Sequence, residues 1–190
     1  GEPLPLDLDL DSLADPAGLV GTAAWGPVAS PVIIGGMGDC LSAFGPKQAQ
    51  ANDIGTAVNI AILQGASDFR GVRVSDGTDV AATGTLAGVT LTAIHTGSAG
   101  NALVATLAQD PIITTNYTLT VSHAVLGSRT YRGATWPVLA AAIAADGTAL
   151  VRATVPTTVP ALEAGSAMLA GGSDGGVPTT AQFLGRDGTS

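Results

Sequence analysis

Residues 21–45, GTAAWGPVASPVIIGGMGDCLSAFG, decide the fold of this chain. The β-branched run at residues 31–34 (PVII) is bounded by prolines and glycines, which predicts a buried strand. Asp39 is expected to cap a helix of one to two turns, because its carboxylate can accept from free backbone N–H groups. Gly45-Pro46 would end that helix. Residues 25–27 (WGP) form a tight corner before the strand. The stretch contains no good nucleophile or base, so we interpret it as scaffold.

Composition narrows the class of protein. A chain of 190 residues can hold one or two domains with real cores. Only 12% of residues are charged, which indicates that a partner covers much of the surface. The formal charge of −8 argues against nucleic-acid binding, and a single cysteine excludes internal disulfides. No apolar run reaches the roughly 18 residues of a membrane span, and no signal peptide is visible. The chain begins with Gly, so we expect a processed or cut piece.

The N-terminal residues 3–11, PLPLDLDLD, alternate with a period of two. In an extended conformation they show a leucine face and a carboxylate face. Such a strand gains most by adding to the edge of a sheet, its own or a neighbour's, and the alternative is an acidic tail without fixed structure. The Asp-x-Asp-x-Asp spacing also suggests a calcium loop. Ser12 and Gly18 stand where that loop needs Gly and Glu, so we reject calcium.

The sequence that follows residues 21–45 predicts a helix and a strand. Residues 51–64 have helical apolar spacing with Asn52 or Asp53 as cap, and we expect this helix to lie on the strand at 32–34. Residues 69–74 (FRGVRV) predict the next strand. Strand, helix and strand with short joins form a βαβ unit, so the two strands should be parallel neighbours. Arg73 is expected to be an exposed arginine at the strand end.

From Ser75 onward the chain is rich in Thr, Val and Ala. Four runs predict short strands of one antiparallel sheet: residues 80–92, 102–108, 117–125 and 148–155. One helix interrupts them, with Thr135 as cap, Pro137 in its first turn and Gly147 as its stop. Between the first two strands lies the turn at 97–101, whose Gly and Asn residues tolerate the positive φ of a tight loop.

Three motifs suggest a catalytic, cofactor or metal site, and each lacks residues that such a site needs. Gly171-x-Ser173-x-Gly175 matches a nucleophile elbow, but Val177-Pro178 follows it and no His occurs after His123. The glycines at 35–38 suggest a dinucleotide turn, but Leu41 replaces the third glycine. Cys40, His95 and His123 are single potential ligands in separate segments. We therefore predict no catalytic, cofactor or metal site, and no enzyme.

The order of these motifs resembles the contractile tail sheath proteins of bacteriophages. That family shows Gly-Thr-Ala-x-Trp-Gly-Pro, then Pro-Val-Ile-Ile, then Asp followed five residues later by Phe-Gly. Further along it carries a strand ending in Arg-Val, a Gly-x-x-Gly-Asn turn and a Gly-Gly-x-Asp-Gly segment. The positions that match are Gly21, Trp25, Gly26, Pro27, Pro31, Asp39, Phe44, Gly45, Gly97, Gly100, Asn101, Gly171, Gly172, Asp174 and Gly175.

The resemblance implies an α+β fold with a small α/β core of strand, helix and strand and an inserted β-rich domain of short antiparallel strands. Residues 1–19 would be an extended arm. Residues 20–74 with 169–190 would form a discontinuous core that is incomplete at its C-terminal end, and residues 75–168 the outward-facing insertion.

The resemblance also implies a mechanical function. Sheath subunits form hexameric rings that stack as a helical tube around the tail tube, with baseplate and tail terminator proteins as further partners. The sheath contracts to drive the tube through the host envelope for genome ejection. Such a subunit is part of the virion tail, is assembled in the bacterial cytoplasm and needs no cofactor, nucleic acid or membrane insertion. We assign Leu4, Leu6, Leu8 and Leu10 to an arm that donates a strand to a neighbouring subunit. The alternatives are a β-rich binding or adhesion domain of a surface or virion protein, and a hydrolase that uses Ser173.

Overall fold

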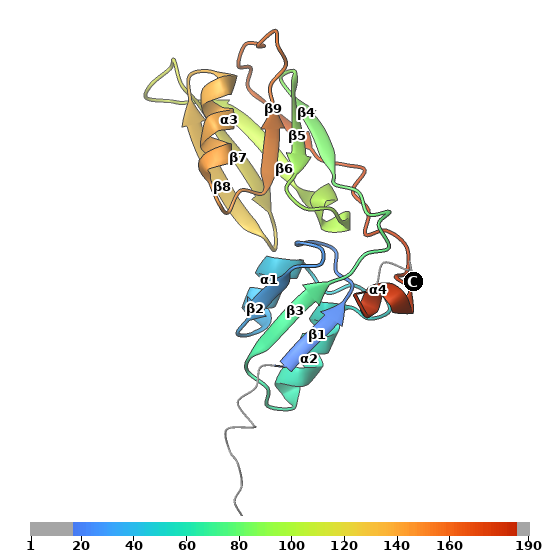
Figure 1. Cartoon of the computed structure of the whole chain (residues 1–190). Helices are drawn as coiled ribbons and strands as arrows, with labels where there is room; N and C mark the ends of the chain where they lie inside the picture. Colours follow the sequence, from blue (N-terminus) through green and yellow to red (C-terminus); the bar gives the residue numbers. More distant parts are fainter. Residues whose placement is uncertain (1–16, 186–190) are drawn as a thin grey trace, which may run out of the picture.

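The structure is a computed structural model that describes residues 17–185. The chain has an α+β fold, as predicted, built in two parts (Figure 1). Residues 17–74, called here the N-terminal unit, form a small sheet with two helices. Residues 80–173, called here the β-rich unit, form two further sheets and one longer helix. The leucine arm at 4–11 lies outside the described residues.

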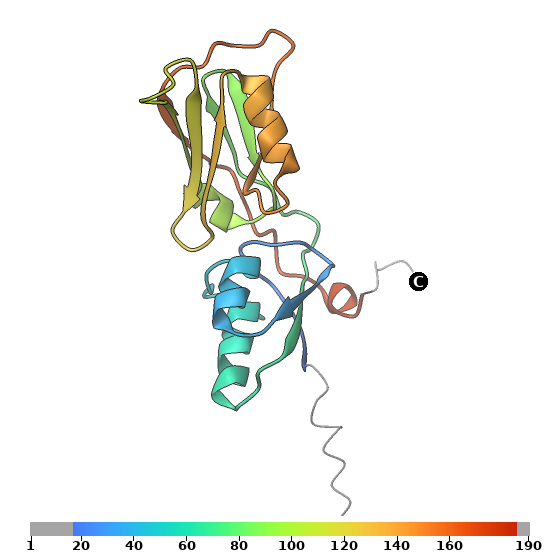
Figure 2. The same cartoon turned by 90° about the vertical axis from the view of Figure 1, so that its left-hand side faces the viewer.

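The sheet of the N-terminal unit has the strand order β1-β3-β2. Strand β1 (Ala17–Gly21) runs parallel to the central strand β3 (Phe69–Arg73), and β2 (Pro31–Ile34) runs antiparallel to it. Helices α1 (Met37–Phe44) and α2 (Ile54–Leu63) cover one face of the sheet, as Figure 2 shows edge-on. The core between the layers contains fully buried Ile34, Phe44, Ile54, Val58 and Phe69.

The predicted parallel pairing of the strands at 31–34 and 69–74 is wrong. The chain between β2 and β3 forms two helices in succession, and the second helix reverses its direction once more. Strand β3 therefore returns antiparallel to β2, and its parallel neighbour is β1, which the sequence did not reveal. Helix α2 packs on β1 and β3, while α1 takes the place beside β2 where α2 was expected.

Strand β2 is an edge strand and not the buried strand that was predicted. Only Ile34 is fully buried, and the side chain of Ile33 is 69% exposed. The reason is that β2 has a neighbour on one side and helices on one face only. Pro31, which has no N–H to donate, stands at the first residue of the strand, where an edge tolerates it.

Of the three ends predicted for helices α1 and α2, two follow the sequence and one does not. Asp53 caps α2 by accepting from Thr56 N at 2.8 Å, as predicted. Gly45, with φ of 78°, ends α1, also as predicted. Asp39, however, is not the cap of α1, because the helix starts earlier, after Gly36. The Asp39 carboxylate lies in the first turn and accepts from Gly35 N at 3.0 Å instead.

The β-rich unit contains two antiparallel sheets where one was predicted. One has the order β4-β5-β9 and the other β10-β6-β7-β8. Their strands are β4 (Thr83–Leu86), β5 (Val89–Ala93), β6 (Val104–Gln109), β7 (Tyr117–His123), β8 (Gly127–Gly133), β9 (Val151–Thr154) and β10 (Gly165–Met168). The predicted run at 80–92 contains both β4 and β5, because Ala87 and Gly88 turn the chain with positive φ. The runs at 127–133 and 165–168 were not predicted as strands.

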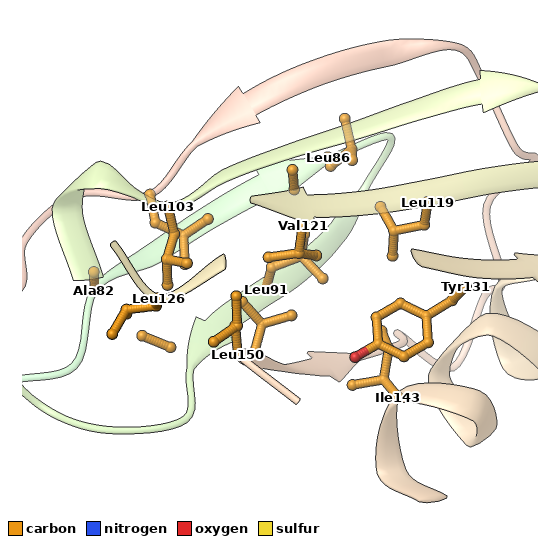
Figure 3. Close-up of a cluster of buried hydrophobic side chains, with 14 of the residues drawn as sticks. Ala82, Leu86, Leu91, Leu103, Leu119, Val121, Leu126, Tyr131, Ile143 and Leu150 are labelled. Atoms are coloured by element: carbon orange, nitrogen blue, oxygen red, sulfur yellow. The ribbon is translucent and has the colours of Figure 1, made fainter. Parts of the chain in front are cut away.

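The two sheets enclose the main core of the molecule (Figure 3). Along β7, Leu119 and Val121 point inward, and they meet Leu91 of β5 from the opposite sheet. Helix α3 (Trp136–Ala145) closes this core with Ile143. It starts after Thr135 with Pro137 in its first turn, as predicted, although the Thr135 side chain makes no capping hydrogen bond.

Two chain segments connect the units, and they lie side by side (Figure 1). Residues 74–80 lead into the β-rich unit and residues 169–176 lead back, ending in the short helix α4 (Thr180–Phe183). Val80 and Ser173 exchange two backbone hydrogen bonds, of 2.9 and 3.0 Å. The units are therefore joined by a short paired ribbon. Within residues 17–185, no helix has both the length and the apolar character needed to cross a bilayer.

Candidate functional site

The junction between the two units gathers most of the residues that the sequence singled out. Four segments meet there: the corner at 24–27, the end of β3, the loop at 95–101 and the return segment at 171–175. The loop includes the 3-10 helix η2 (Ser98–Ala102).

Arg73 is the central side chain of the junction. Its side chain is 1% exposed, so the prediction of an exposed arginine is wrong. Its Nη1 donates to Gly26 O at 2.9 Å and to Thr96 O at 2.8 Å. Gly26 belongs to the N-terminal unit and Thr96 to the β-rich unit, so a single guanidinium group links the two. Loops that are distant in sequence bury this arginine, and no local pattern could have indicated it.

Carboxylates balance the buried charge of Arg73. Burial lowers the pKa of the guanidinium below its ordinary value, and Asp79 and Asp174 act in the opposite direction by favouring its charged form. Asp79 accepts hydrogen bonds from the hydroxyls of Ser75 and Thr96. Burial alone would raise the pKa of Asp79, but these hydrogen bonds and Arg73 hold it below its ordinary value. The charged forms of Arg73 and Asp79 are therefore both favoured over the neutral pH range.

The corner at 25–27 packs against the β-rich unit. The Trp25 ring is buried and meets the His95 ring edge to face, with centroids 5.2 Å apart and an interplanar angle of 87°. Gly26 has φ of 95°, and a Cβ there would stand 2.3 Å from Ala43 O, so no larger residue fits. Burial, followed by the charges of Arg73 and Arg152, lowers the pKa of His95 to about 4. His95 is therefore neutral against Trp25 at neutral pH.

The turn at 97–101 touches both units. Ala99 N donates to Ala24 O at 3.1 Å, and Gly97 N donates to Val80 O at 3.0 Å. Positive φ explains only Gly97, at 127°, and a Cβ there would lie 2.0 Å from Ala24 O. Gly100 is required for another reason, because a Cβ would stand 2.9 Å from the Cβ of Ala82. The predicted reason for the glycines thus holds for one of the two.

The return segment interlocks with that turn. Asn101 Nδ2 donates to Gly172 O at 2.9 Å, and Gly172 N donates to Asn101 Oδ1 at 2.7 Å. Asp174 accepts from Ser98 N at 2.6 Å and from Ser98 Oγ at 2.9 Å. Gly171 and Gly175 shape the segment with φ of 79° and 83°. Two motifs that lie 71 residues apart in sequence are therefore held together by hydrogen bonds.

The remaining motif positions support the corner from the N-terminal unit. A Cβ on Gly21 would stand 2.2 Å from Asn52 O, and one on Gly45 would stand 3.0 Å from the Trp25 Cβ. Phe44 is buried beneath β3, in the core of that unit. Pro27 follows Gly26 in the corner, while Pro31 and Asp39 lie away from the junction, at the start of β2 and in the first turn of α1. Sequence reasoning did not identify Asp79, Thr96 or Ser98, which carry no signal of their own.

The side chains that the sequence offered as possible nucleophiles or metal ligands do not lie together. Ser173 is part of the paired ribbon, and its Oγ accepts from Gly175 N at 3.2 Å. Burial and then Asp53 raise the pKa of the Cys40 thiol to about 11, so it is protonated at neutral pH. His123 Nδ1 accepts from two backbone N–H groups at the β7–β8 turn. Among residues 17–185, no three His, Cys, Asp or Glu side chains are grouped so that they could hold a metal ion.

Comparison with known proteins bears on the fold. No family model and no curated protein matches this sequence. Among solved structures, the sheath tail protein of Listeria innocua is similar with a TM-score of 0.69 and 22% identity, over 88% of this chain and 36% of that one. The sheath tail protein of Desulfitobacterium hafniense is similar with a TM-score of 0.65 and 20% identity, over 88% of this chain and 37% of that one. The chain therefore has the fold of one part of these sheath tail proteins, and it spans about a third of their length.

Proposed function

We propose that this chain is part of a structural subunit of a contractile phage tail sheath. The observation that carries the proposal is that the sheath tail fold extends over 88% of the chain. The motifs that resemble the sheath family also converge in space, since the turn at 97–101 and the segment at 171–175 are bonded to each other.

The nature of the junction supports a mechanical role. A Cβ on Gly26, Gly97 or Gly172 would collide with backbone oxygen atoms. The Asn101 and Asp174 side chains bond to backbone groups. Side chains used in this way fix the chain in one conformation. A subunit that must pass force between its parts needs joints of this kind.

The division into domains is part of this proposal. Residues 20–74 and 169–190 would belong to the sheath core, and residues 75–168 would be the outward-facing insertion. Leu169 is buried in the core of the β-rich unit, and Ala170 and Ser173 pair with Thr83 and Val80. These contacts favour a return boundary close to Gly175 instead of residue 169.

In the assembled tail, such subunits would stack as hexameric rings around a tail tube, between baseplate and tail terminator proteins. The tube would form in the bacterial cytoplasm and work in the virion tail. Of the arm expected at residues 1–19, residues 17–19 belong to β1 and pair with β3 of the same chain. The preceding residues would be the part that ties subunits together by adding a strand to a neighbour's sheet. A strand added in this way keeps its backbone hydrogen bonds while rigid bodies rotate around it, which suits a contracting assembly.

The arm can be tested in the full-length protein by electron microscopy of assembled tubes. Deletion of residues 1–11 should abolish polymerisation. Replacing the leucines at 4, 6, 8 and 10 by serine should do the same, because the apolar face would anchor the strand. The matched control replaces the aspartates at 7, 9 and 11 by asparagine and should leave the tubes intact. Normal tubes from the deletion would refute the assignment of the arm.

The 190-residue chain offers a second test by sedimentation. Because it spans about a third of its structural neighbours, we expect it to lack contacts that a tube needs. It should therefore sediment as a monomer at micromolar concentration. Long filaments formed by this chain alone would contradict the proposal.

A further inference from the structure

His95 lies where the two units touch each other. Its ring belongs to the β-rich unit and meets the Trp25 ring of the N-terminal unit edge to face, with centroids 5.2 Å apart. Trp25 is 3% exposed and packs, with Ala24, into the core of the β-rich unit. A change in the charge of His95 therefore acts at the point where one unit is inserted into the other.

The surroundings of His95 oppose a positive charge on its ring. Burial disfavours the protonated form most strongly, followed by the charges of Arg73 on β3 and Arg152 on β9, and the pKa of His95 falls to about 4. The junction carboxylates Asp79 and Asp174 are bonded to hydroxyl and backbone groups of the neighbouring loops. Within residues 17–185, no ion pair joins His95 to a carboxylate. A proton on this ring therefore meets two cations and no bonded anion.

The two units meet end to end (Figure 1), and few hydrogen bonds cross between them. In the part of the chain that the structure describes, the donors of these bonds are Arg73 Nη1, which bonds to Thr96, and Ala99 N, which bonds to Ala24 O at 3.1 Å. The N-terminal unit has a core of its own, and the core of the β-rich unit contains many residues besides Ala24 and Trp25. Breaking the crossing contacts can therefore separate the units without unfolding them.

We propose that protonation of His95 opens this junction, so that in acid the two units separate while each stays folded. Opening exposes the ring to water and moves it away from Arg73, which restores its ordinary affinity for a proton. The open form therefore gains over the closed form between pH 6.5, the ordinary pKa of histidine, and about pH 4. Above this range the burial of Trp25 and the hydrogen bonds of Arg73 keep the junction closed.

Amide hydrogen exchange of the 190-residue chain tests the opening. The Ala99 N–H is protected by a bond to the other unit, so it exchanges when the junction opens. The amides of Leu119 and Val121 lie in β7, between two strands, and exchange only when the β-rich unit unfolds. Ala99 should therefore be less protected than these two amides. It should also respond less to low concentrations of urea, because a local opening exposes little surface.

The effect of pH identifies the group responsible. After correction for the intrinsic pH dependence of exchange, the protection of Ala99 should fall about tenfold from about pH 6.5 to about pH 4.5, since solvent screens the partly buried ring. His95→Asn and His95→Gln should both remove most of this fall, because neither side chain titrates. His123→Asn is the matched control, because His123 also titrates and forms a hydrogen bond with the backbone of Ala99. That variant should keep the tenfold fall.

Three results would overturn the proposal. The first is an undiminished fall in both His95 variants, and the second is a fall that disappears in His123→Asn instead. The third is protection of Ala99 equal to that of Leu119 and Val121 at every pH and urea concentration, because the junction would then open only when the whole chain unfolds.

Discussion

Asn101 and Gly172 hold each other through two hydrogen bonds, one in each direction, at 2.9 and 2.7 Å. The side-chain amide acts as a backbone peptide would in a sheet, since it offers one donor and one acceptor. It thereby fastens the loop after β5 to the segment that leaves the β-rich unit.

Replacing Asn101 by alanine should lower the free energy of unfolding by about 1–3 kcal/mol, because two backbone groups of Gly172 lose their partner. Asn101→Asp should also destabilise, since a carboxylate oxygen would face Gly172 O. Urea denaturation measures both. Asn59→Ala is the control, because Asn59 is half-buried on helix α2 and its truncation should cost little. Equal losses at positions 101 and 59 would contradict the role of Asn101.

Arg73→Lys should cost about 2–3 kcal/mol, because an ammonium cannot serve the Gly26 and Thr96 carbonyls with the geometry of a guanidinium, and a buried charge then loses hydrogen bonds. Arg70→Lys on the same strand is the control, since Arg70 makes an exposed ion pair with Asp68. Guanidinium chloride denaturation and limited proteolysis of residues 74–80 compare the two. Similar stability and cleavage for both variants would show that Arg73 does not fasten the units.

Gly97→Ala should prevent stable folding or cost more than 3 kcal/mol, because the residue has φ of 127° and its Cβ would lie 2.0 Å from Ala24 O. Gly147→Ala is the matched change, since nothing lies within 4 Å of a Cβ there. Thermal unfolding followed by circular dichroism separates the two. A Gly97→Ala protein with the melting temperature of the parent would be inconsistent with the close contact of the two units.

Stability should fall as the pH falls from about 6.5 to about 4, on account of His95. Its pKa in the folded chain is about 4 against an ordinary 6.5, so the unfolded chain binds the proton more readily across this range. The ring is partly buried, and solvent screening reduces the effect to about 1–2 kcal/mol. His123, whose pKa burial also lowers, acts in the same direction.

His95→Asn isolates the contribution of that residue. Urea denaturation at pH 7 and at pH 4.5 should show a smaller loss of stability between the two pH values for the variant than for the parent chain. The variant will be less stable at both pH values because it loses the contact with Trp25. An unchanged difference between the two pH values would exclude His95 as its source.

Local signals in the sequence predicted local structure well. The cap at Asp53, the proline in the first turn of α3 and the stop at Gly45 act within a few residues, so they can be recognised without the rest of the fold. Strand β10 (GSAM) is the opposite case. It has no β-branched residue, and it is a strand because β6 offers an edge to pair with.

The motifs of the candidate site could be recognised in the sequence, but their meeting at one position in the fold could not be predicted. The glycine-rich turns at 97–101 and 171–175 were both recognised. Their polar groups form hydrogen bonds with each other, and this pairing is visible only in three dimensions. Arg73 shows the same limit. Its buried hydrogen bonds depend on Gly26, which precedes it in the sequence by 47 residues, and on Thr96, which follows it by 23.

The paired ribbon of residues 74–80 and 169–176 has a consequence for motion. A single linker would let the β-rich unit rotate relative to the N-terminal unit, whereas two segments bonded at Val80 and Ser173 resist twisting. Torque applied to one unit is therefore transmitted directly to the other unit. Any turning of the molecule should involve both units at once, with the pivot beyond this ribbon.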